Sequence, residues 1–233
     1  MRGDVIIACD FSSKTETLSF LDKFSQKGYK PYIKIGMELF YKEGPDFVRE
    51  VVDKGYQVFL DLKLNDIPNT VHKAMKNIAS LNVSMTNVHS LGGIEMMKAA
   101  YEGLLEGTTL SKKPELIAVT LLTSIDKNIQ ENELGIKGEI ADNVKRLAEN
   151  TKKAGLDGVV CSPWEAGLMK DLGLISVTPG IRFEGGNVGD QKRVATPALA
   201  KEIGSTYIVV GRPITAAQDP VENYAKCLND FLK

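Results

Sequence analysis

Short apolar runs alternate with amphipathic stretches along the whole chain, and this alternation constrains the fold more than any other feature of the sequence. Each run is nearly continuous in apolar residues, as is typical of parallel strands that are covered on both faces. The eight predicted strands are residues 5–10, 31–36, 57–63, 83–89, 115–122, 157–162, 173–179 and 206–211.

Helical periodicity fills the intervals between these runs. In residues 45–55 apolar side chains recur at helical spacing up to Gly55, which suits a helix C-terminus, and residues 140–155 and 219–233 follow the same pattern. Eight strand–helix units predict an α/β protein, a closed (β/α)8 or TIM barrel that forms a single domain over residues 1–233. An open doubly wound sheet is the alternative. It usually has fewer strands, and the segment DFSSKTE after the first strand lacks the GxGxxG pattern of such folds.

Composition limits the cellular compartments and the binding partners that fit this chain. The 233 residues suit one barrel, and 29 Lys and Arg against 30 Asp and Glu give no charge excess that indicates a nucleic-acid or membrane partner. Three distant cysteines without a CxxC pair argue against a disulfide framework or a zinc site. No apolar run approaches the roughly 20 residues that span a bilayer, and the N-terminus lacks a signal-peptide pattern. We therefore expect a cytoplasmic protein.

Polar residues gather at the predicted C-terminal strand ends, where barrels of this kind carry their active sites. These residues are Asp10, Lys34, Asp61, Lys63, His89, Thr123, Gly211 and Arg212. His89 is interpreted as a support for its strand end, and His72, early in a predicted helix, as a surface residue.

The segment QVFLDLKLNDIPNT, residues 57–70, places charge at the end of an apolar strand. Asp61 and Lys63 are two positions apart and share one side of the strand, which we expect to face the barrel interior near Lys34 of the neighbouring strand. A structural ion pair is the simpler interpretation, but buried pairs contribute little to stability. Several converging charges therefore indicate function. Asp66 lies in the loop beyond the strand, and it could reach across to a partner subunit.

A second group of residues suggests phosphate binding. The long segment 179–197 contains several glycines together with Arg182 and Gln191, as lids often do, and Gly211 and Arg212 follow the eighth strand. Barrels often bind phosphate with the loops after strands seven and eight, where glycine admits the ligand and arginine contacts the oxyanion. An ordinary mobile surface loop is the alternative. The residues thus predict a barrel enzyme for a phosphorylated small molecule, with no sign of a metal or redox cofactor.

Four motifs, in this order, resemble those of bacterial orotidine 5'-monophosphate decarboxylases over essentially the whole chain. The motifs are DLKLNDIPNTV, TPGIRF, GDQKRVATP and GRPITAAQDP. The resemblance implies cofactor-independent and metal-free decarboxylation of orotidine 5'-monophosphate to uridine 5'-monophosphate in pyrimidine biosynthesis, through a C6 carbanion that Lys63 protonates.

The resemblance also implies roles for individual residues. Lys34, Asp61, Lys63 and Asp66 would form a catalytic tetrad, with Asp66 and its neighbours Ile67 and Thr70 reaching the other site of a homodimer. Asp10 and Lys34 would bind the ribose, and Thr123 the pyrimidine. The implied phosphate site consists of Arg182, Gln191, Gly211 and Arg212.

Two other functions stay open at this point. One is a magnesium-dependent sugar-phosphate decarboxylase or aldolase of the same barrel superfamily, which shares the short D-x-K-x-x-D motif but has an acidic residue where this chain has Lys34. The other is a non-catalytic nucleotide-binding barrel, against which a carboxylate facing an anionic ligand argues.

Overall fold

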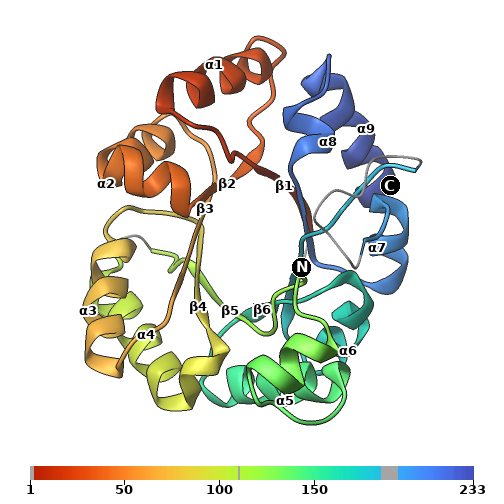
Figure 1. The fold of residues 1–233 in the computed structure, drawn as a ribbon. Coiled ribbons are helices and arrows are strands. Elements are labelled where there is room, and N and C mark those ends of the chain that lie inside the picture. Colours follow the sequence, from red (N-terminus) through yellow and green to blue (C-terminus); the bar gives the residue numbers. More distant parts are fainter. Residues whose placement is uncertain (1–2, 110, 185–193) are drawn as a thin grey trace.

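Eight parallel strands close into a barrel in chain order within residues 3–109, 111–184 and 194–233, which the computed structural model describes. Each strand pairs with the next one along the chain, and β8 pairs with β1 (Figure 1). The strands are β1 (Asp4–Ala8), β2 (Tyr32–Gly36), β3 (Val58–Leu64), β4 (Met85–His89), β5 (Glu115–Val119), β6 (Gly158–Val160), β7 (Ile175–Thr178) and β8 (Tyr207–Val210).

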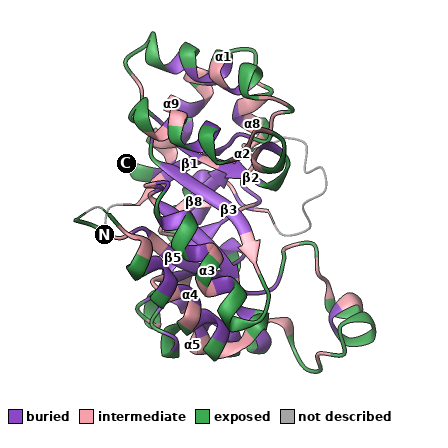
Figure 2. Cartoon of the chain, turned by 90° about the vertical axis from the view of Figure 1, so that its left-hand side faces the viewer, coloured by how far each residue is buried: buried purple, intermediate pink, exposed green. Residues whose placement is uncertain are grey.

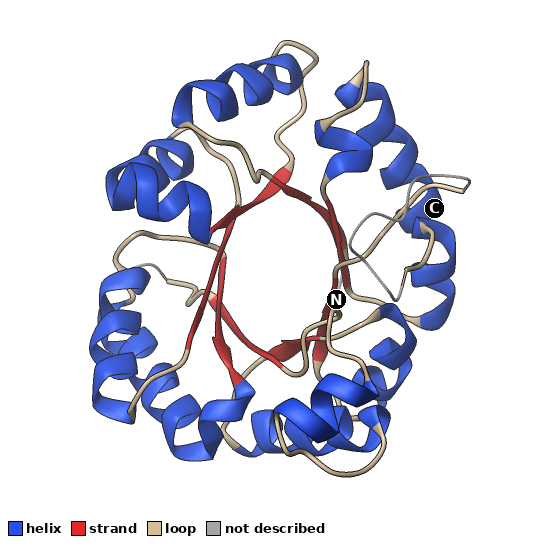
Figure 3. Cartoon of the chain, in the orientation of Figure 1, coloured by secondary structure: helices blue, strands red, loops and turns tan. Residues whose placement is uncertain are grey.

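Helices surround the ring of strands on its outer side (Figure 3). None of them, in the part of the chain that the structure describes, is long and apolar enough to cross a membrane. The α-helices are α1 (Lys14–Ser25), α2 (Met37–Asp53), α3 (Pro68–Ala79), α4 (Gly93–Gly107), α5 (Ile140–Lys153), α6 (Ala166–Asp171), α7 (Pro197–Ile203), α8 (Arg212–Thr215) and α9 (Pro220–Leu232). Shorter turns are η1 (Ser90–Gly92), η2 (Ile129–Glu133) and η3 (Pro163–Glu165).

Local sequence fixes where several helices begin. The Ser13 side chain accepts a hydrogen bond from the backbone N–H of Glu16 at the start of α1. Asp219 accepts bonds from Val221 and Glu222 at the start of α9, 3.0 Å each. Such caps satisfy N–H groups that have no partner inside the helix.

The core has layers inside and outside the ring of strands. Large side chains such as Phe59 and Met85 fill the barrel interior, while Leu60 of the same strand packs in the layer between the strands and the helices. Figure 2 shows the strands largely buried and the outer helix faces exposed. The arrowhead of β3 points away from the side on which both chain ends lie, so the polar strand ends form the opposite mouth of the barrel.

The predicted fold class is confirmed, and all eight predicted strands are present with ends that differ by up to three residues. The helix predicted over 45–55 is the second part of α2, which begins at Met37 and is interrupted at Gly44, where φ is 75°. Pro45 follows this break. Glycine reaches positive φ without steric cost, so the chain changes direction there.

Helices α3 and α4 pack against each other through glycines. A Cβ added at Gly103 would lie 2.1 Å from the carbonyl oxygen of His72, and one at Gly107 would lie 2.1 Å from that of Lys76. On the same faces, Glu106 of α4 contacts His72 at 3.3 Å and Lys76 at 3.2 Å. Small side chains on α4 therefore permit the close approach of α3.

Candidate active site

A row of alternating charges crosses the mouth of the barrel from β1 to β3. Nζ of Lys34 lies 2.8 Å from Oδ1 of Asp10 and 3.5 Å from Oδ2 of Asp61, and Nζ of Lys63 lies 2.8 Å from Oδ1 of Asp61. We call Asp10, Lys34, Asp61 and Lys63 the charged row. The structure thus brings together four residues that the sequence placed at three strand ends.

Gly36 makes room for one end of the charged row. A Cβ at this position would lie 3.0 Å from Nζ of Lys34 and 3.1 Å from Oδ1 of Asp10. These contacts are tighter than ordinary van der Waals contacts, so a side chain at position 36 would press on the ion pair. The absence of a side chain at Gly36 therefore leaves room for the ion pair between Lys34 and Asp10.

The backbone at Lys63 is irregular. The pairing of β3 with β4 shifts between Leu60 and Leu64, and Lys63 has a φ of 53°. Such a φ is uncommon for a residue with a side chain and tends to occur at functional sites. The N–H of Lys63 donates to Oδ1 of Asn87 at 2.8 Å, and Nδ2 of Asn87 donates to Oδ1 of Asp61 at 2.7 Å.

The sequence analysis did not single out Asn87. The available signal was an amide in the middle of a predicted buried strand, because a buried amide requires hydrogen-bond partners. Its partners lie on β3 and could not be identified from β4 alone.

Mutual attraction keeps Asp61 and Lys34 ionised despite their burial. Burial opposes the charged form of Asp61, but Lys34 and Lys63 together with hydrogen bonds from Lys63 and Asn87 outweigh it and lower the pKa of Asp61. Burial likewise opposes the ammonium of Lys34, but Asp61 and Asp10 outweigh it and raise the pKa of that lysine. Both groups are therefore charged at neutral pH.

A cavity, which we call the inner cavity, opens beside the charged row. Its wall is mainly apolar, with Lys34, Asp61 and Lys63 as its charged members and Thr123 at its edge. The other residues that line it are Phe59, Val119, Leu121, Leu122, Val160, Cys161, Val177, Pro179 and Val209. A planar ring that carries a few polar groups fits such a wall.

A second, more polar cavity adjoins the first, and we call it the outer cavity. It shares Lys34, Pro179 and Val209 with the inner cavity. The predicted phosphate-binding residues Arg182, Gly211 and Arg212 line it, together with Ala8, Asp10, Gly180 and Thr215. Residues 185–193 of the predicted lid, Gln191 among them, lie outside the described residues.

Gly211 leaves space toward the outer cavity. A Cβ there would meet Ala8 at 3.7 Å, which is an ordinary contact. Packing of the described residues therefore does not demand a glycine at this position, and a ligand that approaches the backbone would use the space.

The segment after β3 lies away from both cavities. Asp66, Ile67 and Thr70 are exposed, and none of the three is among the described residues that line either cavity. Oδ1 of Asp66 accepts a hydrogen bond from the N–H of Ile67 at 2.7 Å, and Ile67 is 66% exposed. A single chain thus does not bring Asp66 to Lys63.

The two histidines lie in different surroundings. His89 ends β4, and its Nδ1 is buried without a hydrogen-bond partner among the described residues. Burial and the positive charge of Lys63 lower the pKa of His89. His72 is half-buried and contacts Glu106, so it is less exposed than expected for a surface residue.

Among the described residues, no group of three or more His, Cys, Asp or Glu side chains is arranged to hold a metal ion.

Comparisons with known proteins agree along the whole chain. A model of the family described as "Orotidine 5'-phosphate decarboxylase / HUMPS family" matches residues 3–227. An orotidine 5'-phosphate decarboxylase of Enterococcus faecalis is 52% identical over 235 residues, with 99% of each chain covered. One of Bacillus cereus strain Q1 is 50% identical over 228 residues, with 96% of this chain and 95% of the relative covered. The crystal structure of orotidine 5'-phosphate decarboxylase from Lactobacillus acidophilus superposes with a TM-score of 0.89 and 41% identity, covering 99% of this chain and 100% of the other.

Proposed function

The chain belongs to the orotidine 5'-phosphate decarboxylase / HUMPS family and is a carboxy-lyase of pyrimidine biosynthesis, and we propose that its charged row converts orotidine 5'-monophosphate to uridine 5'-monophosphate. One observation carries this proposal. The ammonium of Lys63, 2.8 Å from Asp61, borders an apolar cavity that adjoins a cavity lined by two arginines. The pyrimidine fits the inner cavity, and the phosphate fits the outer one.

Lys63 supplies the positive charge that the reaction requires. Loss of CO2 from C6 leaves an electron pair in the plane of the pyrimidine, where the π system of the ring does not delocalise it. Stabilisation must then come from charge that is already in place. Lys63 provides this charge and donates a proton to C6 as general acid.

Asp61 lies near the departing carboxylate in this mechanism. Its pKa is lowered, so it is ionised when the substrate carboxylate approaches. The like charges repel each other, and part of this repulsion is relieved as CO2 leaves. We propose that stabilisation of the carbanion by Lys63 is the larger effect.

The remaining predicted residues bind the rest of the nucleotide. Lys34, which lines both cavities, and Asp10, which lines the outer one, bind the ribose hydroxyls, and Thr123 of the inner cavity contacts the pyrimidine. Arg182, Gly211 and Arg212 bind the phosphate together with Gln191. Binding energy from the phosphate can be used to stabilise the transition state at the distant pyrimidine.

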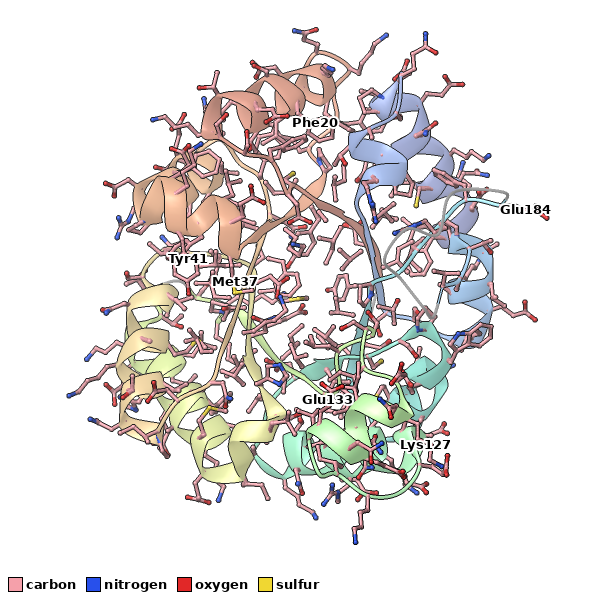
Figure 4. The ribbon with its side chains drawn as sticks, viewed as in Figure 1. Phe20, Met37, Tyr41, Lys127, Glu133 and Glu184 are labelled. Carbon is pink, nitrogen blue, oxygen red and sulfur yellow. The ribbon has the colours of Figure 1, made fainter. Side chains whose placement is uncertain are left out.

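The active enzyme is a homodimer in which Asp66, Ile67 and Thr70 enter the site of the partner subunit. Three exposed apolar side chains support this arrangement: Ile67 after β3 is 66% exposed, and Tyr41 and Met37 on α2 are 74% and 43% exposed. Figure 4 shows Met37 and Tyr41 close together on α2. Exposed apolar side chains that lie next to each other, as Met37 and Tyr41 do, often mark an interface. Asp66 of the partner would then hold Lys63 from the side opposite Asp61.

We place the enzyme in the cytoplasm. Cys9, Cys161 and Cys227 are buried and outside any disulfide in the described part of the chain, which fits a reducing compartment.

A spectrophotometric assay tests the function directly. Purified protein should remove the absorbance of orotidine 5'-monophosphate and yield uridine 5'-monophosphate at the same rate with and without EDTA. Activity that EDTA abolishes would favour the magnesium-dependent alternative. Binding of the nucleotide without turnover would favour a non-catalytic barrel.

A further inference from the structure

Asn87 contacts both members of the central ion pair without lining the substrate cavity. It lies in β4 with no exposed surface, and the described residues that line the inner cavity do not include it. Its Oδ1 accepts the backbone N–H of Lys63, and its Nδ2 donates to Oδ1 of Asp61. One carboxamide therefore connects the backbone of one charged residue with the carboxylate of the other.

The hydrogen bond from the N–H of Lys63 to Asn87 stabilises an irregular part of β3. Leu60 pairs with Thr86 and Leu64 pairs with Val88, so β3 uses more residues than β4 to cover the same distance. The excess residues of β3 lie opposite Asn87, and the N–H of Lys63 donates to the side chain of Asn87. Because Lys63 has a φ of 53°, its backbone needs an external constraint to stay in this conformation.

The second contact fixes the rotation of the Asp61 carboxylate. Oδ1 of Asp61 accepts hydrogen bonds from Nδ2 of Asn87 at 2.7 Å and from Nζ of Lys63 at 2.8 Å. This leaves Oδ2 toward Lys34, at 3.5 Å. A carboxylate held in this way presents one oxygen to each lysine.

We propose that Asn87 is a positioning residue that holds the backbone of Lys63 and the carboxylate of Asp61 together, so that the ammonium of Lys63 is aimed at C6 of the substrate. The inference rests on the proposed function of Lys63. Small displacements at a reacting centre are costly, since an error of about 1 Å can reduce the rate by about 100-fold.

Two variants at this position separate the contacts. Asn87→Ala removes both hydrogen bonds, and kcat should fall by about 100-fold, the loss expected of a misplaced catalytic group. The affinity for uridine 5'-monophosphate should stay close to that of the wild type, because the ribose and phosphate contacts come from other strands. Asn87→Asp has nearly the same shape and keeps an acceptor for Lys63, but it places a second carboxylate against Asp61.

The pH profile of Asn87→Asp provides a readout that a purely structural role would not change. Protonation of the new acid restores a donor toward Asp61, so the ratio of its kcat to that of the wild type should rise as the pH falls. The charged groups around position 87 are Asp61 and Lys63 in direct contact and Lys34 beyond Asp61, and His89 on the same side of β4 is a titratable group. The facing residue of β5, Ile117, is apolar. All of these groups are also present in the wild type, so the ratio removes the part of their titration that the substitution does not change.

Thr86→Val is the matched control. Thr86 is as buried on β4 as Asn87, and its hydroxyl donates a hydrogen bond to the carbonyl of Leu60 at 3.1 Å. Leu60 is where the irregular part of β3 begins, but this hydrogen bond does not involve the charged row. It should lose thermal stability and keep kcat.

The outcomes decide the proposal. A normal kcat in Asn87→Ala, or a pH ratio for Asn87→Asp that does not change, overturns it. If neither variant folds where Thr86→Val does, Asn87 serves only to hold the strand, and the proposal fails. The proposed function fails separately, if the wild type does not decarboxylate orotidine 5'-monophosphate or if Lys63→Ala keeps its kcat.

Discussion

Nζ of Lys63 and Oδ1 of Asp61 lie 2.8 Å apart, with one intervening residue on β3. Their side chains are 26% and 11% exposed, so much of the hydration of both charges is lost. Buried ion pairs are weak stabilisers because the loss of hydration offsets the attraction. The pair is therefore better explained by the charge that it presents to the inner cavity than by a contribution to folding.

Lys63→Ala should reduce kcat by several orders of magnitude, since general acid catalysis alone contributes about 10²–10⁴-fold and the electrostatic contribution is lost as well. Binding of uridine 5'-monophosphate should remain measurable by calorimetry, because the phosphate contacts are intact. A near-normal kcat in a variant that binds the product would show that Lys63 is not the proton donor.

Arg212→Ala should weaken recognition of the substrate phosphate and leave the decarboxylation step unchanged. Its kcat/KM for orotidine 5'-monophosphate should fall by about 10- to 100-fold, the effect of losing a hydrogen bond to a charged group. Its activity on phosphate-free orotidine should change little. Lys98→Ala on α4, which removes an equal charge outside both cavities, is the control. An equal loss on both substrates would remove Arg212 from the phosphate site.

Mixed dimers test whether the site is shared. Asp66→Asn and Lys63→Ala subunits should each be inactive as homodimers. In a mixed dimer, one of the two sites receives Lys63 from one subunit and Asp66 from the other, so activity should return. Subunit exchange can be followed with two affinity tags. Exchange without any recovery of activity would mean that Asp66 does not enter the site of the partner subunit.

The fold was predictable because its signals are local. Apolar runs, helical periodicity and glycine stops lie within single elements, and together they gave eight strands in the right places. The charged row was predictable in part, since strand alternation places Asp61 and Lys63 on the same side. The role of Asn87 was not, because the extra residues of β3 are apparent only when β3 is paired with β4. The burial of His72 was not predictable either, because it depends on the close packing of α3 against the glycines of α4.

Gly103→Ala should destabilise the barrel without affecting the active site. The added Cβ would lie 2.1 Å from the carbonyl oxygen of His72, so α3 and α4 would have to separate, and such overpacking costs about 1–3 kcal/mol. This corresponds to a decrease in Tm of roughly 2–4 °C for each kcal/mol. Gly167→Ala in α6 is the control, because its Cβ would lie 3.4 Å from the carbonyl oxygen of Ile203. That variant should be neutral or more stable, and equal Tm changes in both would contradict the packing argument.

His89 should make the protein less stable in mildly acidic solution. Burial and Lys63 lower its pKa in the folded state, whereas in the unfolded chain it titrates near its ordinary value of 6.5. As the pH falls through 6.5, the unfolded chain therefore takes up a proton that the folded protein resists, and the free energy of unfolding decreases. His89→Gln removes this difference, so between pH 7.5 and 5.5 its Tm should fall less than that of the wild type. Above pH 7.5 the two curves should run parallel, because the histidine is neutral in both states. Curves that stay parallel down to pH 5.5 would show that His89 takes up its proton as readily in the folded protein as in the unfolded chain.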